Sequence, residues 1–582
     1  MHCPAQQAGQ CFFYSIHLQR FVVISLLFFF APLFLFAQYS RADSLRGALR
    51  PERTCFDVGF YNLNISVDTA AKSISGYNEI VFKVLDQTER IQIDLFANMV
   101  IDSIVFHRLR LAYTREFSAV FVDFPGYLMQ GMQEKIKVYY HGKPISVSAK
   151  ESPWEAGFVW QKDKNGKPWI GVACEGGGAS LWWPNKDHLS DEPDSMRVTC
   201  EVPGDLQCIS NGVLEKHSVF RGNINYHVSV FQWKINYPIN NYNVTLNIGD
   251  YVHFGEDYIS GKDTLKCDYY VLPYNLEKAK EHFKQVKPML AIYENLFGPY
   301  PFWKDGYALV ETAYWGMEHQ GAVAYGNRYL KGKFGHVPED SVGVQLKNID
   351  FDYIIIHESG HEYWGNSVSM KDMADMWIHE GFCTYTEVLY VEKFYGYDDA
   401  LKYLRIQAES IDNDKPIIGD YNVNKEGSGD MYPKGSWMLH TIRNIVNNDS
   451  LWFATIKGIT TDFKISNVDT KQIEDYMELK LNKELTPVFD QYLRHKELPV
   501  LKVEVKKHFC KVDVTCALES NVPGFSLPLL YSMDNGVTWK ELTLNNNKAE
   551  LRISKKQYQQ MKFSNHLHLF KVQIIPNEKL KK

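Results

Sequence analysis

Two histidines four residues apart, with a glutamate directly after the first, stand in the stretch "HESGHEYWGN" at residues 357–366. On an α-helix, positions i and i+4 lie on nearly the same face, so His357 and His361 can point one ring nitrogen each at a shared metal ion. Glu358 lies about 100° further round the helix, where it can reach a water on the metal without being a ligand itself. The spacing therefore predicts a zinc site with a general base beside it.

A catalytic zinc ion needs three protein ligands and one open position, so a third ligand must come from elsewhere. Glu380, in "DMWIHEGFCTYTE", is the candidate. We expect a second helix to begin near Asp375, a plausible N-cap residue, and to carry Glu380 back across the first helix. Glu387 follows two helical turns later on the same face, where it either accepts a ring N–H from a zinc histidine or is an exposed helix acid.

These motifs together resemble the zinc-binding signature of the aminopeptidase N family, peptidase family M1, whose relatives include leukotriene hydrolase. The family combines a His-Glu-x-x-His helix, a Gly-Asn pair shortly after it, and an Asn-Glu-Gly-Phe stretch that carries the third ligand. In this chain His379 replaces the Asn, whereas the Glu-Gly-Phe at 380–382 matches. The resemblance covers roughly residues 55–497 and implies that His357, His361 and Glu380 bind one zinc ion per chain.

The stretch "YWGMEHQGA" resembles the family's Gly-x-Met-Glu-Asn exopeptidase motif, with Gly316, Met317 and Glu318 matching and His319 in place of Asn. By that resemblance Glu318 binds the free α-amine of the substrate. A carboxylate suits this role, since a buried cation left unpaired would cost several kcal/mol. A protonated His319 beside Glu318 would compete with the ammonium, so binding is expected to strengthen as pH rises through about 6.5.

Two further residues match family positions. In the family an acid or a glutamine stands nine residues before a proline in the amino-terminal domain, and Glu175 stands nine before Pro184 in "ACEGGGASLWWPNKD". This implies a second amine-binding acid, although the glycines at 176–178 depart from the usual sequence. Tyr432 in "DMYPKGSWML" resembles the family's catalytic tyrosine, which implies a hydrogen-bond donor to the oxyanion that forms during hydrolysis.

The resemblance implies a zinc-dependent aminopeptidase that acts on peptides with a free N-terminus, with Glu358 activating a water on the zinc ion. The alternative is a thermolysin-like zinc endopeptidase, if Glu318 does not recognise a free amine. A secreted binding protein that kept the fold and lost catalysis is a third interpretation. An epoxide hydrolase side activity is compatible with the family, but nothing in the sequence singles it out.

With 582 residues, 45% of them hydrophobic, the chain is too long for one hydrophobic core. Period-two alternation in "NLNISVD" and "RIQIDLF" predicts half-buried strands, and hence an antiparallel β domain over 38–251. After residue 276, apolar residues recur three and four positions apart, which predicts a helix with a possible kink at Pro288. Mainly helical sequence follows from 350 to 495. With the resemblance, this predicts an α+β multidomain fold, in which a saddle-like β domain precedes a thermolysin-like catalytic domain at 252–497 and a small β-sandwich-like domain at 498–582.

The net charge of −6 comes from 69 acidic and 63 basic residues without long runs, which argues against a basic face for nucleic acid. The apolar run at residues 21–36, followed by Ala37, predicts a signal peptide at 1–37 and export to the periplasm or the extracellular space. An uncleaved membrane anchor at 21–36 is the alternative.

None of the ten cysteines forms a Cys-x-x-Cys pair, which argues against a cysteine zinc cluster. In an oxidising compartment Cys200 with Cys208, or Cys510 with Cys516, could form local disulfides; buried free thiols are the alternative.

Overall fold

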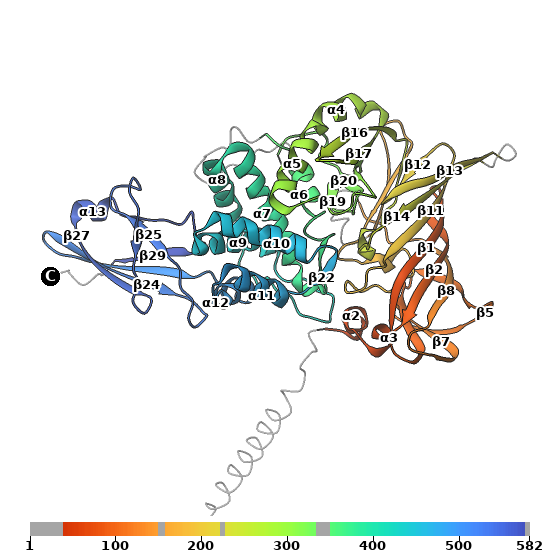
Figure 1. Cartoon of the computed structure of the whole chain (residues 1–582), viewed down its shortest axis with the longest axis horizontal. Helices are drawn as coiled ribbons and strands as arrows, with labels where there is room; N and C mark the ends of the chain where they lie inside the picture. The colour runs from red at the N-terminus through yellow and green to blue at the C-terminus, as the bar shows by residue number, and fades with distance from the viewer. Residues whose placement is uncertain (1–38, 149–156, 222–226, 333–349, 577–582) are drawn as a thin grey trace, which may run out of the picture.

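The computed structural model describes residues 39–148, 157–221, 227–332 and 350–576, so the expected signal peptide at 1–37 lies outside the described residues. The chain forms a β-rich N-terminal part, a largely helical middle and a smaller β part at the C-terminal end, arranged in a row (Figure 1). This confirms the predicted α+β multidomain fold. Within the described ranges, no helix is both long enough and apolar enough to cross a membrane.

The N-terminal part contains an eight-stranded sheet whose alternation is the predicted one: Leu63, Ile65 and Val67 on β1 are buried. The expected antiparallel pairing holds for most neighbours, but β1 and β11 run parallel; the chain leaves the large sheet after β8 and passes through two strands of another sheet before it returns as β11. In spatial order the strands are β13 (Val213–Arg221), β14 (His227–Ile235), β11 (Ser195–Pro203), β1 (Phe56–Asp68), β2 (Ser73–Val84), β8 (Gln133–Gly142), β4 (Met99–Phe106) and β5 (Leu109–Arg110).

Two smaller sheets complete this part and share one hydrophobic core with the large sheet. One has the strand order β12 (Gln207–Ile209), β15 (Asn247–Gly249), β10 (Pro168–Ala173) and β9 (Gly157–Lys162). The other has the order β3 (Thr88–Asp94), β7 (Ala119–Leu128) and β6 (Ala112–Glu116). The short helices α2 (Arg41–Gly47) and α3 (Pro51–Thr54) precede β1, and two 3₁₀ turns lie at Ala179–Leu181 and Asn241–Asn243.

A five-stranded mixed sheet leads into the helical middle. Its edge strand, β19, carries the Gly-Met of the exopeptidase-like motif. The order is β16 (Val252–Ser260), β17 (Asp263–Val271), β18 (Tyr307–Glu311), β20 (Val323–Tyr325) and β19 (Gly316–Met317). The helix predicted after residue 276 is present as α4 (Leu276–His282) and α5 (Val286–Phe297), separated by a 3₁₀ turn at Phe283–Gln285. The break precedes Pro288, as the prediction of a kink there suggested.

The helical middle carries both candidate zinc helices. It contains α6 (Tyr353–Gly360), α7 (Trp377–Tyr395), α8 (Tyr397–Ala408), α9 (Pro433–Val446), α10 (Asp449–Asp462), α11 (Thr470–Leu481) and α12 (Thr486–Phe489), with the paired strands β21 (Val368–Met370) and β22 (Ser466–Val468). The predicted N-cap role of Asp375 is wrong. It ends a 3₁₀ turn before α7 and accepts hydrogen bonds from Tyr421 and Thr470 instead.

The C-terminal part consists of two small sheets, as the returning alternation predicted. Their strand orders are β27 (Lys548–Ser554), β24 (Lys511–Glu519), β23 (Val500–Lys507), β29 (Lys571–Pro576), and β26 (Lys540–Leu542), β25 (Leu529–Ser532), β28 (Lys562–Phe563); α13 spans Lys555–Gln559. The eight cysteines of the described ranges are all free thiols, and only Cys510 is exposed.

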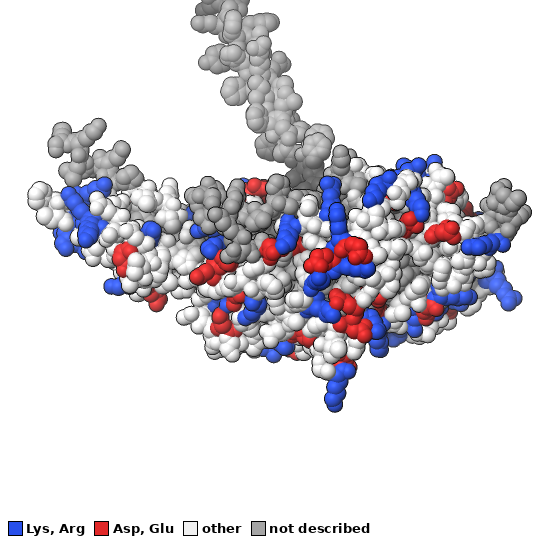
Figure 2. All heavy atoms as spheres, turned by 90° about the horizontal axis from the view of Figure 1, so that it is seen from above, with Lys and Arg blue, Asp and Glu red and all other residues white. Residues whose placement is uncertain are grey.

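Charged side chains of both signs are interspersed on the face shown in Figure 2, and neither sign gathers into one large patch there. This distribution agrees with the absence of long like-charge runs in the sequence. A nucleic-acid-binding surface would instead collect Lys and Arg side chains on one face or along one helix.

Candidate active site

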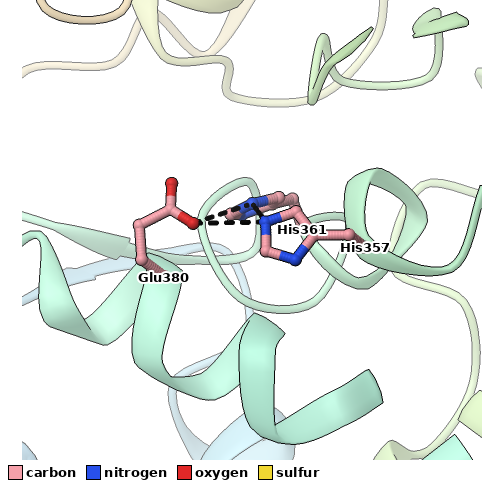
Figure 3. Close-up of side chains that lie close together, drawn as sticks. All are labelled: His357, His361 and Glu380. Carbon is pink, nitrogen blue, oxygen red and sulfur yellow. Dashed lines mark hydrogen bonds and ion pairs between the residues drawn. The ribbon is translucent and has the colours of Figure 1, made fainter. Parts of the chain in front are cut away.

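The side chains of His357, His361 and Glu380 converge on one point (Figure 3). The two Nε2 atoms of the histidines are 3.3 Å apart, and Glu380 Oε2 lies 3.3 Å from His357 Nε2 and 3.6 Å from His361 Nε2. Zinc bonds of about 2.0–2.2 Å in a tetrahedral arrangement would separate ligand atoms by about 3.3–3.6 Å. The three residues therefore fit a zinc ion, and their donor set is that of a catalytic rather than a structural site.

Local structure places the two histidines. Helix α6 begins after Asp352, whose Oδ1 accepts hydrogen bonds from the backbone N–H groups of Ile354 and Ile355 at 2.9 and 3.4 Å. This cap satisfies N–H groups that lack a partner within the helix. His361 follows the last helical residue, and its Nδ1 donates to the carbonyl oxygen of Trp364 at 2.9 Å. That bond fixes the ring and leaves Nε2 free to bind a metal.

Glu387 holds the other histidine. Its Oε1 lies 2.7 Å from His357 Nδ1, and its Oε2 accepts a hydrogen bond from Tyr403 at 2.5 Å. The Glu387 side chain is only 3% exposed, so it is a buried partner of the metal-site histidine and not an exposed helix acid. The His357 ring also stacks on Tyr353, with ring centroids 5.2 Å apart. Both contacts restrict the orientation of the imidazole.

Glu358 is buried beside the three candidate ligands, close to strand β19. A Cβ atom on Gly316 would lie 2.7 Å from Glu358 Oε1 and 2.9 Å from the side chain of Ile354. Only glycine lets the strand approach the carboxylate this closely, which gives a physical reason for a glycine directly before Met317. Burial raises the pKa of Glu358 to about 7, against the lowering effect of the two neighbouring histidines.

Two acids from different sheets occupy the adjoining space. Glu318, 3% exposed, accepts a hydrogen bond from the hydroxyl of Tyr242 at 3.0 Å. Glu175, on the turn after β10, is also buried, and burial followed by the charges of Glu318 and Glu380 raises its pKa well above the ordinary value. One ligand atom each from Glu318, Glu358 and His361 lies within 4.8 Å of the others. Glu318 therefore borders directly on the candidate metal centre, and Glu175 lines the same cavity.

Sequence reasoning missed three residues that support Glu318, directly or through a neighbour: Tyr242, Asn366 and Asn243. Asn366 donates from Nδ2 to the Glu318 carbonyl oxygen at 2.9 Å, and Asn243 donates to Asn366 Oδ1 at 2.6 Å. The Gly-Asn pair after the zinc helix was a signal that Asn366 has a role, but it did not indicate the partner. Tyr242 lies in a different part of the chain, and no motif marks it.

The prediction for His319 is wrong. Its side chain is fully buried, it is absent from the residues that line the pocket, and neither ring nitrogen has a hydrogen-bond partner among the described residues. Burial lowers its pKa to about 3. His319 is therefore neutral at pH 6.5, and the expected competition with a substrate ammonium does not arise. His379, the other departure from the family pattern, accepts a hydrogen bond from the backbone N–H of Met370 at 2.8 Å.

Tyr432 precedes α9 and faces the same pocket, with its ring stacked at 6.1 Å from that of His357. Helix α9 reaches this position because it packs closely on α7: a Cβ atom on Gly435 would lie 3.0 Å from the Cα of Gly381. Lys434 anchors the start of α9 by donating to the carbonyl oxygens of His495 and Lys496 at 2.8 and 2.9 Å. Glycines in two separate motifs therefore bring Tyr432 next to the metal-site histidines.

These side chains surround a cavity of about 570 Å³. Its lining includes five glutamates and, among the described residues, no Lys or Arg. With two histidines as the only other ionisable groups besides tyrosines, the cavity carries an excess of negative charge and is suited to cations. The predicted site residues that line it are Glu175, Gly316, Met317, Glu318, His357, Glu358, His361, Glu380, Glu387 and Tyr432.

A His-Glu-x-x-His helix whose third ligand is a glutamate on the next long helix defines a zinc centre of the metallopeptidase class. Residues 281–492 match the model of the Peptidase family M1 domain, so the chain contains an M1 peptidase domain. The matched segment includes both zinc helices, Glu318 and Tyr432.

Among curated proteins, the chain is similar to Aminopeptidase M1 of Arabidopsis thaliana, with 22% identity over 57% of this chain and 38% of that protein. It is also similar to Leucyl aminopeptidase of Saccharolobus solfataricus, with 21% identity over 53% of this chain and 39% of that one. The chain thus spans less than two fifths of these relatives. Among solved structures, an M1 zinc metallopeptidase from Deinococcus radiodurans shares the fold, with TM-score 0.61 and 20% identity over 76% of this chain and 95% of that one.

Proposed function

We propose that this protein is a zinc-dependent aminopeptidase that hydrolyses the N-terminal peptide bond of peptides with a free α-amine. The observation that carries the proposal is the pair of buried acids, Glu318 and Glu175, beside the candidate zinc ligands. The similar curated proteins described above are aminopeptidases, which supports the same activity class.

His357, His361 and Glu380 would hold the zinc ion, and their mutual distances support this assignment. Bound zinc would act as a Lewis acid and lower the pKa of water toward about 7. Glu358 takes the proton of the attacking water and passes it to the leaving amine. A carboxyl whose pKa burial raises to about 7 is suited to both steps near neutral pH, because it can accept and release a proton there.

Glu318 and Glu175 fix the substrate's amino terminus. Burial and the charge of Glu318 raise the pKa of Glu175, because two adjacent negative charges without a cation among the described lining residues are unfavourable; an α-ammonium between the two acids would stabilise both as carboxylates. Each contact is a charge-assisted hydrogen bond, the stronger class of such bonds. The first peptide bond is thereby held beside Glu358, which is a positioning effect on the rate.

Tyr432 donates a hydrogen bond to the oxyanion that forms when water adds to the carbonyl carbon. Burial raises the pKa of its phenol well above 10, so the hydroxyl keeps its proton throughout the neutral range. Removal of one such donor typically costs about 2.7–4 kcal/mol of transition-state stabilisation. The stacking of Tyr432 near His357 supports this role, because it keeps the phenol at the metal side of the cavity.

A panel of aminoacyl fluorogenic substrates, each with a free or an acetylated amine, tests the proposal. We expect cleavage of the free-amine series only, with activity lost on zinc chelation and restored by added zinc. Equal cleavage of both series would replace this function with that of a thermolysin-like endopeptidase. Cleavage of neither series by the zinc-loaded protein would overturn both.

We also propose that residues 1–37 direct export to the periplasm or the extracellular space and are then removed. N-terminal sequencing of the protein secreted from a bacterial host should begin at Gln38; an intact segment 21–36 in the membrane fraction would favour an anchor instead.

The proposed division at 38–251, 252–497 and 498–582 is supported by β16, which begins at Val252, and by β23, which begins at Val500. Limited proteolysis should cut near 498, and resistance there would argue against a separate C-terminal domain.

A further inference from the structure

The turn that carries Glu175 is held by an arginine from the first helix of the described chain. The turn is closed by a hydrogen bond from the Gly178 N–H to the Cys174 carbonyl oxygen at 2.5 Å. Arg46, near the end of α2, donates from Nη2 to the carbonyl oxygens of Gly176, at 3.3 Å, and Gly177. A guanidinium that donates to consecutive carbonyl oxygens fixes the direction of both peptide groups.

The contact between Arg46 and the turn requires a glycine at residue 178, within the stretch that departs from the family pattern. Gly178 has a φ angle of +79°, which side chains rarely allow, and a Cβ atom there would lie 2.5 Å from both Arg46 Nη2 and Asp187 Oδ2. Any larger residue at 178 would displace the guanidinium or the turn. The glycine-rich stretch and Arg46 are therefore matched to each other.

Hydrogen bonds at both ends hold helix α2 in place, and this fixes the position of the Arg46 backbone. A capping box between Ser40 and Asp43 starts the helix. At its end, the fully buried Arg53 donates from Nη1 to the carbonyl oxygen of Arg46 and from Nη2 to Asp94 Oδ2 at 2.7 Å. Gln92, also buried, donates to the carbonyl oxygen of Leu45 at 3.0 Å.

The same helix contacts the helical middle of the molecule. A Cβ atom on Gly47 would lie 2.4 Å from the backbone nitrogens of Val423 and Asn424, so α2 touches that loop without intervening side chains. Asn424 in turn donates from Nδ2 to the Gly176 carbonyl oxygen at 3.5 Å. Figure 1 shows α2 at the side of the N-terminal part that faces the helices. The Glu175 turn is thus held between two parts of the chain.

We infer that Arg46 is a positioning residue for the substrate's amino terminus, acting through the turn at 174–178 on Glu175. The buried Oε1 of Glu175 has no hydrogen-bond partner among the described residues. Glu318 is the side-chain neighbour of the Glu175 carboxyl group, so the position of the unpartnered oxygen also depends on the backbone that Arg46 holds. The role in amine binding rests on the proposed aminopeptidase function, whereas the role in holding the turn does not.

Hydrogen exchange tests the holding of the turn without reference to activity. Arg46→Ala removes both donated bonds, and peptide-resolved exchange of amides 174–180 in the zinc-loaded protein should become at least about tenfold faster, as expected for loss of a charge-assisted bond. Arg46→Lys, which keeps a cationic donor, should be intermediate. Arg41→Ala is the control, because Arg41 lies on the same helix but pairs with Glu116 at the surface. Unchanged exchange in Arg46→Ala overturns the inference, and Arg46→Gln serves if Arg46→Ala does not fold.

Kinetics test the consequence for substrate. In Arg46→Ala the KM of a free-amine substrate should rise about tenfold while kcat changes less than about twofold, since the loss falls on binding of the amine. A fall in kcat with KM unchanged, or no change in either, overturns the link to amine binding. A wild type that cleaves no free-amine substrate overturns the proposed function instead, and the exchange experiment still decides whether Arg46 holds the turn.

Discussion

His357 Nδ1 and Glu387 Oε1 are 2.7 Å apart in the buried floor of the cavity, and Tyr403 binds the other oxygen of the same carboxylate. The carboxylate therefore fixes which nitrogen of His357 carries the proton and leaves Nε2 for the metal. Glu387→Gln would replace a charged acceptor by a neutral amide of the same size. We expect zinc affinity to fall by about 10- to 100-fold, measured by competition with a chelator. Glu484→Gln, at an exposed position, is the control, and equal affinity in both variants would contradict the role of Glu387.

Variants of the zinc ligands should lose the metal, whereas a variant of the general base should keep the metal and lose activity. His361→Ala and Glu380→Ala should each lose most of the bound zinc, because three protein ligands are needed. Glu358→Gln should retain about one zinc ion per chain and lose most hydrolysis, since the amide fills the same space but cannot accept a proton. Elemental analysis and initial rates on the same preparations measure both. Full zinc retention in both ligand variants would rule out this ligand set.

Gly316→Ala should impair catalysis although residue 316 carries no functional group. The added methyl would lie 2.7 Å from Glu358 Oε1, so the carboxylate must move away from the position where it meets the water. Displacements of about 1 Å can cost on the order of 10²-fold in rate. We expect kcat to fall by about that factor with zinc content unchanged. Gly126→Ala, in open space and without a positive φ, is the control for the mutation itself. Wild-type kcat in Gly316→Ala would show that the close approach has no catalytic importance.

Acetylation of the substrate amine and removal of Glu318 should delete the same interaction. Glu318→Ala is expected to lower cleavage of free-amine substrates by at least about 10²-fold, with little further loss for acetylated ones. A full cycle of rates for two proteins and two substrates measures the coupling. Independent, additive losses would mean that Glu318 does not bind the amine. Because His319 is buried and neutral, its titration should contribute no gain in binding as pH rises through 6.5.

Folding stability should fall in acid because of buried histidines near the C-terminal part. Burial lowers the pKa of His440 to about 3 and that of His568 to about 4, and the charges of Arg443 and His566 act in the same direction. The unfolded chain, with histidine pKa values near 6.5, binds more protons, so the free energy of unfolding decreases as pH falls below about 6.5 and levels off near 4 and below. The two shifts together correspond to a loss on the order of 5–10 kcal/mol once the pH is below both folded-state pKa values.

Urea unfolding of the wild type and of His568→Asn from pH 7 to pH 4.5 measures this effect. The variant cannot gain a proton at residue 568, so its stability should decline less steeply over the same range. Carboxylates titrate in both proteins, so the difference between the two curves of unfolding free energy against pH gives the contribution of His568. Parallel curves would contradict the assignment of acid sensitivity to His568.

The chemistry of the metal centre was predictable because it depends on local spacing. Positions i and i+4 share a helix face whatever surrounds them, so His357 and His361 were assigned from sequence alone. The resemblance to the M1 signature then supplied Glu380, Glu318 and Tyr432 by order along the chain, and all three line the cavity. The alternation of buried and more exposed residues along the strands and the helix break before Pro288 were likewise local properties of the chain.

The remaining parts of the site depend on which surfaces fold together, and local sequence does not encode that. Spacing left Glu387 undecided between an exposed acid and a buried partner of His357; burial by neighbouring helices decided it. A histidine next to Glu318 suggested a titrating competitor, but the tertiary structure buries His319 and keeps it neutral. Arg46 carries no motif at all, and it reaches the Glu175 turn because long-range contacts, among them those with a loop far along the chain, hold α2 in place. Residue types and periodicity determined the metal chemistry and the order of the parts, whereas long-range packing determined which neighbours hold and tune each catalytic group.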